Sequence, residues 1–377
     1  MRAIEAIADS RPVRWVRSWR ERQVEVAFGA GLMLVVVLGF AAGEMLARVH
    51  HANAIAGRDF DWMSVMVQME REDPAGPMRF PRGSNVDGLR FNALGLRGPD
   101  VPRPKPDDTV RLAFVGDSKL VNGEFAEQEM IAARTAALLQ AGHRTCRFDH
   151  VTVAGPAYTI EDLAYLIDTE VGALEADIYI VLVGATRDAL TVHARDARDG
   201  GYMAQYPFLG HYSVLWDKLS RAFHLRRQAR FAAQRGPLPK LEGDRIATAL
   251  DAPLARLDAA MGDAPVLAVG YRGRMRAGQS DAELARSTRQ IRMETRKLGA
   301  RDFVALNAAI VNAQRRAAAR HGWAFADPIM TIAGTEENFI DSAHFSRKGI
   351  ALFSRELAGL LAPMLPQTDA SCLAVGR

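Results

Sequence analysis

The longest apolar stretch of the chain lies near its N-terminus, where residues 26–43 (VAFGAGLMLVVVLGFAAG) carry no charged side chain. Glu25 and Glu44 bound this stretch on its two sides. A bilayer core needs about 17–25 consecutive apolar residues, and the stretch lacks the polar face that a surface helix of a soluble domain shows. The pattern therefore predicts a transmembrane helix over residues 26–43.

The segments on either side of this helix differ in character. Residues 1–25 are basic, whereas residues 44–108 predict a linker with an irregular lead-in, because residues 50–108 are rich in Pro, Gly, Asp and Arg. Positive charge ahead of a first span predicts a cytoplasmic N-terminus and an extracytoplasmic remainder. A cleaved signal peptide and a buried soluble helix are the alternatives, although the basic region is long for a signal peptide. Trp15 and Trp19, one helical turn apart, are typical of a membrane interface. The residues that indicate the orientation are Arg11, Arg14, Arg17, Arg20 and Arg22.

From residue 109 the pattern changes to short apolar runs that alternate with amphipathic segments. Nearly uninterrupted apolar runs suit parallel strands that are covered on both faces. Strands that alternate with helices predict an α/β domain with a parallel sheet, over residues 109–365, whose ligands bind beyond the carboxyl ends of the strands. The predicted strands are 110–116, 148–155, 177–184, 264–270 and 323–328, and the predicted helices are 126–142, 160–174, 303–322 and 346–365.

Residues from about 190 to 262 interrupt this alternation and predict a helical insertion between the third and fourth strands. Within it, apolar residues at helical spacing precede a cluster of arginines: Trp216, Leu219, Phe223, Arg226, Arg227 and Arg230. Such a helix suits a lid or a face lying on anionic lipid headgroups. An ordinary helix packed on the domain explains the same pattern.

Composition narrows the classes of function. The chain has 377 residues, 49% of them hydrophobic, so it can build a sizeable core and is not disordered as a whole. Its formal net charge is only +4, and no stretch interleaves clustered basic residues with aromatics, so a nucleic-acid partner is not expected. Its two cysteines, Cys146 and Cys372, show no metal-ligand spacing and either pair or stay free; we expect neither a metal nor a cofactor. Residues 366–377 form a tail.

A polar motif follows the first predicted strand. Gly116, Asp117 and Ser118 end the apolar run, which places Ser118 at the functional edge of the predicted sheet. A nucleophilic serine needs a base, and the base needs an acid that orients it. Asp341 and His344 stand three apart in the loop before the last predicted helix, a spacing at which a carboxylate can reach the imidazole. Ser118, His344 and Asp341 are therefore the candidate catalytic residues.

The Gly-Asp-Ser at the end of the first strand and the Asp-x-x-His before the last helix together resemble the SGNH (GDSL-like) hydrolase family, over about residues 88–365. The lead-in RFNALGLRGPDVPRPKPDDTVRLAFVGDS is similar to the segment before the nucleophile in membrane-anchored bacterial members. The resemblance implies a flavodoxin-like three-layer domain with a five-stranded parallel sheet. It also implies that Ser118 attacks an ester carbonyl, that His344 takes its proton, and that Asp341 orients His344.

The resemblance further implies an oxyanion hole, made by the backbone N–H of Ser118, a backbone N–H of a second block and an Asn side chain of a third. In the second block, VAGPAYT, Gly155 stands for one usual glycine and Ala157 occupies about the place of the other. The third block, GATRD, has no Asn, and Thr186 or Arg187 takes its place according to how the block is counted. Losing one oxyanion donor typically costs about 10²–10³ in rate, which predicts a slow site.

Two classes of function follow. The first is a membrane-anchored ester hydrolase or O-acyltransferase at the bacterial inner membrane, with its domain in the periplasm. Its expected partners are the lipid bilayer and an acyl ester of the cell envelope, with acetyl esters of polysaccharides among the candidates implied by the resemblance. The second is a catalytically degenerate domain that binds a glycan or scaffolds a membrane assembly; the altered second and third blocks favour it, and the intact Ser118, Asp341 and His344 oppose it.

Overall fold

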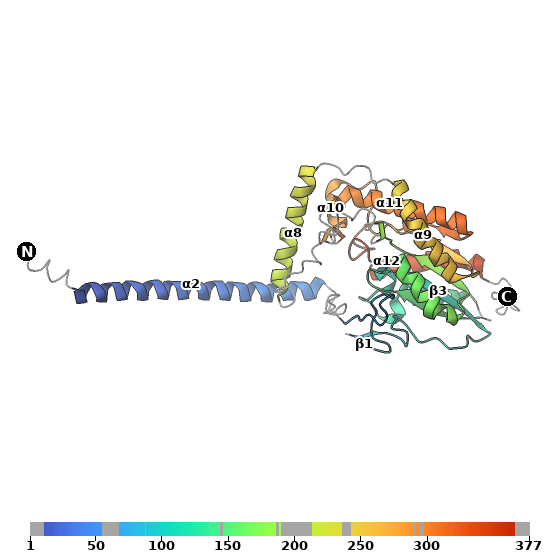
Figure 1. Ribbon diagram of the computed structural model, residues 1–377, viewed down its shortest axis with the longest axis horizontal. Coiled ribbons are helices and arrows are strands. Elements are labelled where there is room, and N and C mark those ends of the chain that lie inside the picture. Colours follow the sequence, from blue (N-terminus) through green and yellow to red (C-terminus); the bar gives the residue numbers. More distant parts are fainter. Residues whose placement is uncertain are drawn as a thin grey trace, which may run out of the picture. The chain divides into compact units, whose positions relative to one another are not determined.

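The structure, a computed structural model, is divided into two compact units (Figure 1). The first unit comprises Met1–Asp59 and Pro207–Ala222, and the second comprises Phe60–Tyr206 and Phe223–Arg377. The structure describes residues 11–54, 68–86, 88–143, 146–185, 188–189, 213–235, 243–289, 291–293 and 298–365.

A single long helix dominates the first unit. Helix α2, Arg11–Ala54, contains the predicted apolar stretch and continues well beyond it on both sides. Its segment Arg22–Val49 has a mean hydropathy of 2.3 and is, by length and composition, able to cross a membrane. The helix expected from the hydrophobic pattern is therefore present.

The second unit is built on a five-stranded sheet in which every neighbouring pair is parallel. The strand order is β4-β3-β5-β6-β7, so the chain steps from β3 to one neighbour and then returns to the other side. Ligands of such sheets bind where this reversal occurs, beyond the carboxyl ends of the strands. The strands are β3 Thr109–Gly116, β4 Arg147–Ala154, β5 Ile178–Leu182, β6 Val266–Val269 and β7 Ala324–Ala326. The predicted fold class is confirmed.

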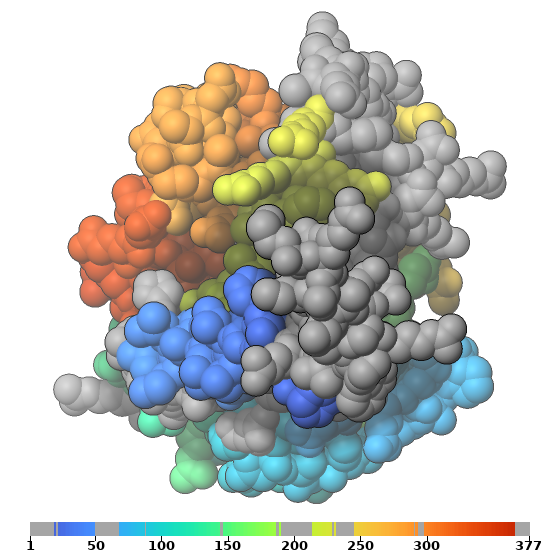
Figure 2. Space-filling view, turned by 90° about the vertical axis from the view of Figure 1, so that its left-hand side faces the viewer, coloured from blue at the N-terminus to red at the C-terminus, as the bar shows by residue number. Residues whose placement is uncertain are grey.

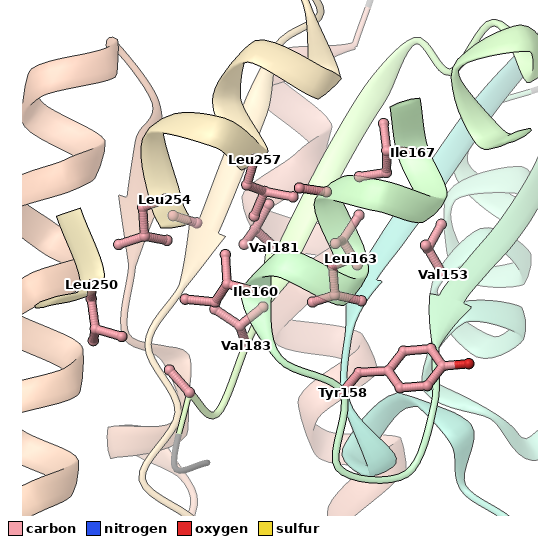
Figure 3. Close-up of a cluster of buried hydrophobic side chains, with 14 of the residues drawn as sticks. Val153, Tyr158, Ile160, Leu163, Ile167, Val181, Val183, Leu250, Leu254 and Leu257 are labelled. Carbon is pink, nitrogen blue, oxygen red and sulfur yellow. The ribbon is translucent and has the colours of Figure 1, made fainter. Parts of the chain in front are cut away.

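The sheet is covered on both faces because successive side chains of each strand point to opposite sides. On β3, Ala113 and Val115 belong to one buried cluster, whereas Leu112 and Phe114 belong to another. The first cluster packs under α6 (Ile160–Leu166), α9 (Gly243–Met261) and α11 (Ala300–His321), and Figure 3 shows part of it between the sheet, α6 and α9. The second packs under α5 (Ile131–Gly142) and α12 (Arg347–Leu361). The result is a three-layer domain.

Several helices differ in extent from the sequence pattern. The predicted helix 126–142 begins as a 3-10 turn, Glu127–Glu129, before α5, and the predicted helix 160–174 continues beyond α6 as a π turn and a 3-10 turn. Within the interval from 190 to 262, the structure describes α8 (Val214–Arg235) and α9. Leu250, Leu254 and Leu257 of α9 are buried in the core, so α9 is the crossover helix between β5 and β6.

The lead-in before β3 contributes to the core of the second unit. Phe80 and Phe91 stack with ring centroids 4.0 Å apart, and both belong to the same buried cluster as α6 and α9. A two-stranded ladder, β1 (Asn85–Val86) with β2 (Leu89–Arg90), lies in this segment. Cys146, directly before β4, is buried, and Cys372 lies outside the described residues.

Candidate active site

Ser118 stands where β3 gives way to a short helix, α4 (Ser118–Val121). Asp117 caps this turn, because its Oδ1 accepts a hydrogen bond of 3.1 Å from the backbone N–H of Lys119. Strand β5 approaches this turn so closely that only glycine fits at residue 116, since a Cβ there would lie 2.4 Å from the carbonyl oxygen of Leu182. The nucleophile candidate thus sits on a tight turn at the carboxyl edge of the sheet.

Asp341 and His344 lie in a loop that is fixed at both ends. Phe339 and Phe345 form an antiparallel bridge and stack with centroids 4.8 Å apart, so the residues between them form a closed turn. Asp341 Oδ1 accepts hydrogen bonds of 2.7 Å from the backbone N–H groups of Ala343 and His344. The carboxylate therefore organises the turn that carries the imidazole.

The loop brings His344 to Ser118 across 226 residues of sequence. His344 Nε2 lies 3.0 Å from Ser118 Oγ, and His344 Nδ1 lies 2.8 Å from Asp341 Oδ2. In one tautomer, Nδ1 donates to the carboxylate and Nε2 accepts from the hydroxyl, which is the arrangement a general base needs. The three residues named from the sequence thus form one hydrogen-bonded chain.

The charges and hydrogen bonds around His344 strongly favour the protonated form of its imidazole. Burial by itself would lower the pKa of His344, but the charge and hydrogen bond of Asp341 outweigh it and raise the pKa to about 9. Burial likewise opposes ionisation of Asp341, yet the His344 charge and the hydrogen bonds that the carboxylate accepts lower the pKa of Asp341. The pair is coupled and only partly open to water, with the two side chains 16% and 25% exposed.

A buried cation beside the nucleophile has no counterpart in the sequence-based prediction. Lys119 Nζ pairs with Asp117 and lies 5.3 Å from the centre of the Tyr271 ring. Asp117 Oδ2 also accepts a hydrogen bond of 3.1 Å from the backbone N–H of Gly184, and a Cβ on Gly184 would lie 2.1 Å from Lys119 Nζ. The Lys119–Asp117 ion pair therefore contacts the residues that follow three neighbouring strands, β3, β5 and β6.

Arg97, in the lead-in, holds the segment that follows the nucleophile. Its buried guanidinium donates to the carbonyl oxygens of Val121, Asn122 and Phe125. Asn122 has a φ of 46°, and its side chain donates to the Lys119 carbonyl at 2.9 Å. No local pattern of the sequence identifies Arg97, because an arginine in an irregular segment is ordinarily exposed.

The predicted oxyanion residues are only partly placed. Gly155 and Ala157 follow β4, the neighbour of β3, and Ala157 has a φ of 58°, a left-handed value that favours glycine. A Cβ on Gly155 would lie 2.2 Å from the Tyr158 ring, so this position requires glycine. Thr186 and Arg187 lie outside the described residues. The oxyanion roles of all four stay predictions.

Within the part of the chain that the structure describes, no group of His, Cys, Asp and Glu is suited to hold a metal ion. The chemistry available at this edge is that of the serine hydroxyl, the imidazole, the carboxylate and the buried Lys119–Asp117 pair.

No protein-family model matches the chain, and no curated protein matches it. Solved structures do match. A lipase/acylhydrolase from Enterococcus faecalis is 13% identical, with a TM-score of 0.39, over 69% of this chain and 98% of that one. A psychrotrophic esterase from Pseudoalteromonas is 12% identical, with a TM-score of 0.39, over 67% and 97%. A member of the lipolytic G-D-S-L family from Veillonella parvula is 12% identical, with a TM-score of 0.37, over 68% and 100%.

At 12–13% identity and TM-scores of 0.37–0.39, these matches do not assign a function to this chain. The geometry of Ser118, His344 and Asp341 is therefore the observation on which a functional assignment depends.

Proposed function

We propose that this chain is a serine ester hydrolase or O-acyltransferase of the SGNH type, anchored to a membrane by α2. The single observation that supports it most is the hydrogen-bonded chain from Ser118 Oγ through His344 to Asp341. Ordinary serines of helix N-termini do not require a histidine that is itself oriented by a carboxylate. The arrangement matches a nucleophile with its base and the group that orients the base.

The proposed reaction begins when neutral His344 accepts the Ser118 proton at Nε2 as Oγ attacks the ester carbonyl. The resulting imidazolium is stabilised by Asp341, and it then gives its proton to the leaving alcohol as the carbon–oxygen bond breaks. An acyl group remains on Ser118 Oγ. Water or an acceptor hydroxyl, deprotonated by His344, then attacks the acyl carbon. The bond from this carbon to Ser118 Oγ breaks, and His344 returns the proton to Oγ, which regenerates Ser118.

Water and an acceptor hydroxyl resolve the same intermediate, so the proposal covers both outcomes. We propose that the acyl ester belongs to the cell envelope, in keeping with the apolar helix near the N-terminus. In this proposal the second unit lies on the extracytoplasmic side of the membrane, in keeping with the arginines that precede the apolar stretch.

The test of the proposed activity uses a fluorophosphonate probe and p-nitrophenyl acetate with the full-length protein. Labelling and turnover should both be lost in Ser118→Ala. Ser280→Ala is the matched control, because Ser280 caps α10 (Asp281–Ser287) and takes no part in the hydrogen-bonded chain. Equal labelling of the wild-type protein and Ser118→Ala would reject the serine nucleophile.

The absence of Asn between residues 184 and 188 favours a second candidate, a binding module without turnover. That candidate predicts no labelling of the wild-type protein although it is folded by circular dichroism. Acetate release from an O-acetylated polysaccharide, with and without an added acceptor sugar, separates hydrolase from transferase: hydrolysis is unaffected by the acceptor, whereas transfer yields acylated acceptor.

A further inference from the structure

The N-terminus of α8 is bound by a carboxylate of α2. Glu44 Oε1 accepts a hydrogen bond of 3.0 Å from the backbone N–H of Val214. Glu44 Oε2 accepts one of 2.9 Å from the N–H of Leu215 and one of 2.7 Å from the Ser213 hydroxyl. Helix N-termini leave backbone N–H groups without partners, and a carboxylate satisfies them well. The first turn of α8 therefore lies beside Glu44, the residue of α2 that directly follows the apolar stretch 26–43.

Packing strengthens this attachment within the first unit. A Cβ on Gly43 would lie 2.8 Å from Leu215 Cδ2, so the two helices touch at a position where α2 has no side chain. One turn along α8, Lys218 Nζ donates to the Ala47 carbonyl oxygen at 3.4 Å. These contacts join the first turns of α8 to the part of α2 that follows residue 43.

One face of α8 exposes large apolar side chains. Trp216, Leu219 and Phe223 follow one another at spacings of three and four, which places them on the same side of a helix. They are 38%, 54% and 69% exposed, and part of α8 (yellow) is open at the surface in Figure 2. Three such side chains in a row on a water-facing surface are unusual and mark an interaction site.

The next turns of the same face are basic. The exposed arginines that continue it at spacings of three, four and seven are Arg226, Arg227 and Arg230. Asp217 is the single acidic residue in the sequence of α8, and it pairs with Arg221. We call these three apolar and three basic residues the α8 face. Its charge complements an anionic surface, and its apolar part begins beside the end of the apolar stretch.

We propose that the α8 face lies on the surface of the membrane that α2 crosses. Trp216, Leu219 and Phe223 enter the boundary between headgroups and acyl chains, and the arginines bind phosphates of anionic lipid headgroups. The proposal rests on the membrane anchor of the proposed function. The occupant is a bilayer because Glu44 fixes the start of the face to the end of the hydrophobic segment. A lid over the active site would require no such attachment.

The experiment uses the tryptophan of the face as its probe. The full-length chain is placed in lipid nanodiscs whose phospholipids carry bromine near the glycerol end of the acyl chains, where bromine quenches nearby indole fluorescence. The emission that Trp216→Phe removes is the Trp216 component. We expect this component to be quenched by the brominated lipid, and more strongly in discs containing phosphatidylglycerol than in phosphatidylcholine discs. Changing Arg226, Arg227 and Arg230 together to Gln should abolish that difference.

Trp323 provides the matched control. It is buried in the second unit and donates to Asp258 Oδ1 at 2.7 Å, so the component lost in Trp323→Phe should not respond to brominated lipid. A Trp216 component that brominated lipid leaves unchanged overturns the proposal, whether aqueous iodide quenches it, as for a water-facing helix, or not, as for a helix covered by protein. An unchanged lipid preference in the arginine variant overturns the phosphate contacts.

Two measurements separate this proposal from the function on which it rests. Trp19 lies on α2 ahead of the apolar stretch and is exposed, so its component, lost in Trp19→Phe, reports on the anchor itself. Quenching of Trp19 without quenching of Trp216 means that α2 is inserted and that the α8 face is elsewhere. Turnover of p-nitrophenyl acetate in the Trp216→Phe protein reports on the esterase activity, which this variant should leave unchanged.

Discussion

Replacing Asp341 with Asn should change both the rate of the proposed esterase and the pH at which it works. In the wild-type protein, Asp341 raises the pKa of His344 from 6.5 to about 9 against the opposing effect of burial. Only neutral His344 can accept the Ser118 proton. The rate constant kcat/KM should therefore rise about tenfold per pH unit below the apparent pKa and level off above about pH 9.

The magnitude follows from the pKa difference. A change from 6.5 to about 9 corresponds to roughly 3 kcal/mol of net stabilisation of the imidazolium, at about 1.4 kcal/mol per pH unit. Without the carboxylate, burial and the Lys119 charge are opposed only by the Glu124 charge, so the inflection in Asp341→Asn should move down from about pH 9 toward the ordinary histidine value. The plateau rate should fall by up to about 10⁴, because the amide no longer fixes the tautomer or stabilises the cation.

The assay is initial hydrolysis of p-nitrophenyl acetate from about pH 5 to about pH 10, corrected for spontaneous hydrolysis, for the wild-type protein and the variant. Asp281→Asn is the control, since Asp281 is an exposed partner of Arg301 and should leave the profile unchanged. A wild-type inflection at or below the ordinary histidine value would refute the argument. So would an inflection that does not move in Asp341→Asn.

Stability gives an independent check with a definite sign. Because the folded-state pKa of His344 lies above its unfolded value of 6.5, the stabilisation is fully present below about pH 6.5 and is lost as the pH rises through about 9. In urea unfolding, Asp341→Asn should therefore lower the free energy of unfolding more near pH 6 than near pH 10. Both pH values lie above the range in which Asp341 itself titrates.

Two further predictions concern buried charges. Lys119→Met should lower the free energy of unfolding by about 3–5 kcal/mol, because it leaves the Asp117 carboxylate buried without its cation, and the double variant Asp117→Asn/Lys119→Met should recover part of this loss in urea titrations. Burial lowers the pKa of His150 to about 4, so the fold should lose stability as the pH falls from about 6.5 through 4. His150→Gln, which cannot take up that proton, should flatten the pH dependence of Tm over this interval; a slope equal to that of the wild-type protein would contradict the second prediction.

Local patterns were enough to predict most of the second unit. The five strands were predicted to within a few residues, because buried parallel strands are continuous apolar runs and the Gly and Pro residues around them mark their ends. The strand edge of Ser118 and the loop of Asp341 and His344 were predicted for the same reason, since each follows from a position relative to an element. The break of the predicted helix 160–174 into α6 and two irregular turns has no comparable local signal.

The sequence by itself determined the apolar helix, the parallel sheet and the residue types of the candidate triad, all of which depend on neighbours along the chain. Only the tertiary structure decided that Lys119 lies over Tyr271 beside Gly184, that Arg97 binds the segment after the nucleophile, and that Glu44 binds the start of α8. Each of these contacts joins residues from elements that are distant in sequence. A long charged side chain is equally compatible with water and with a buried partner, and the choice depends on which backbone groups the fold brings within hydrogen-bonding distance.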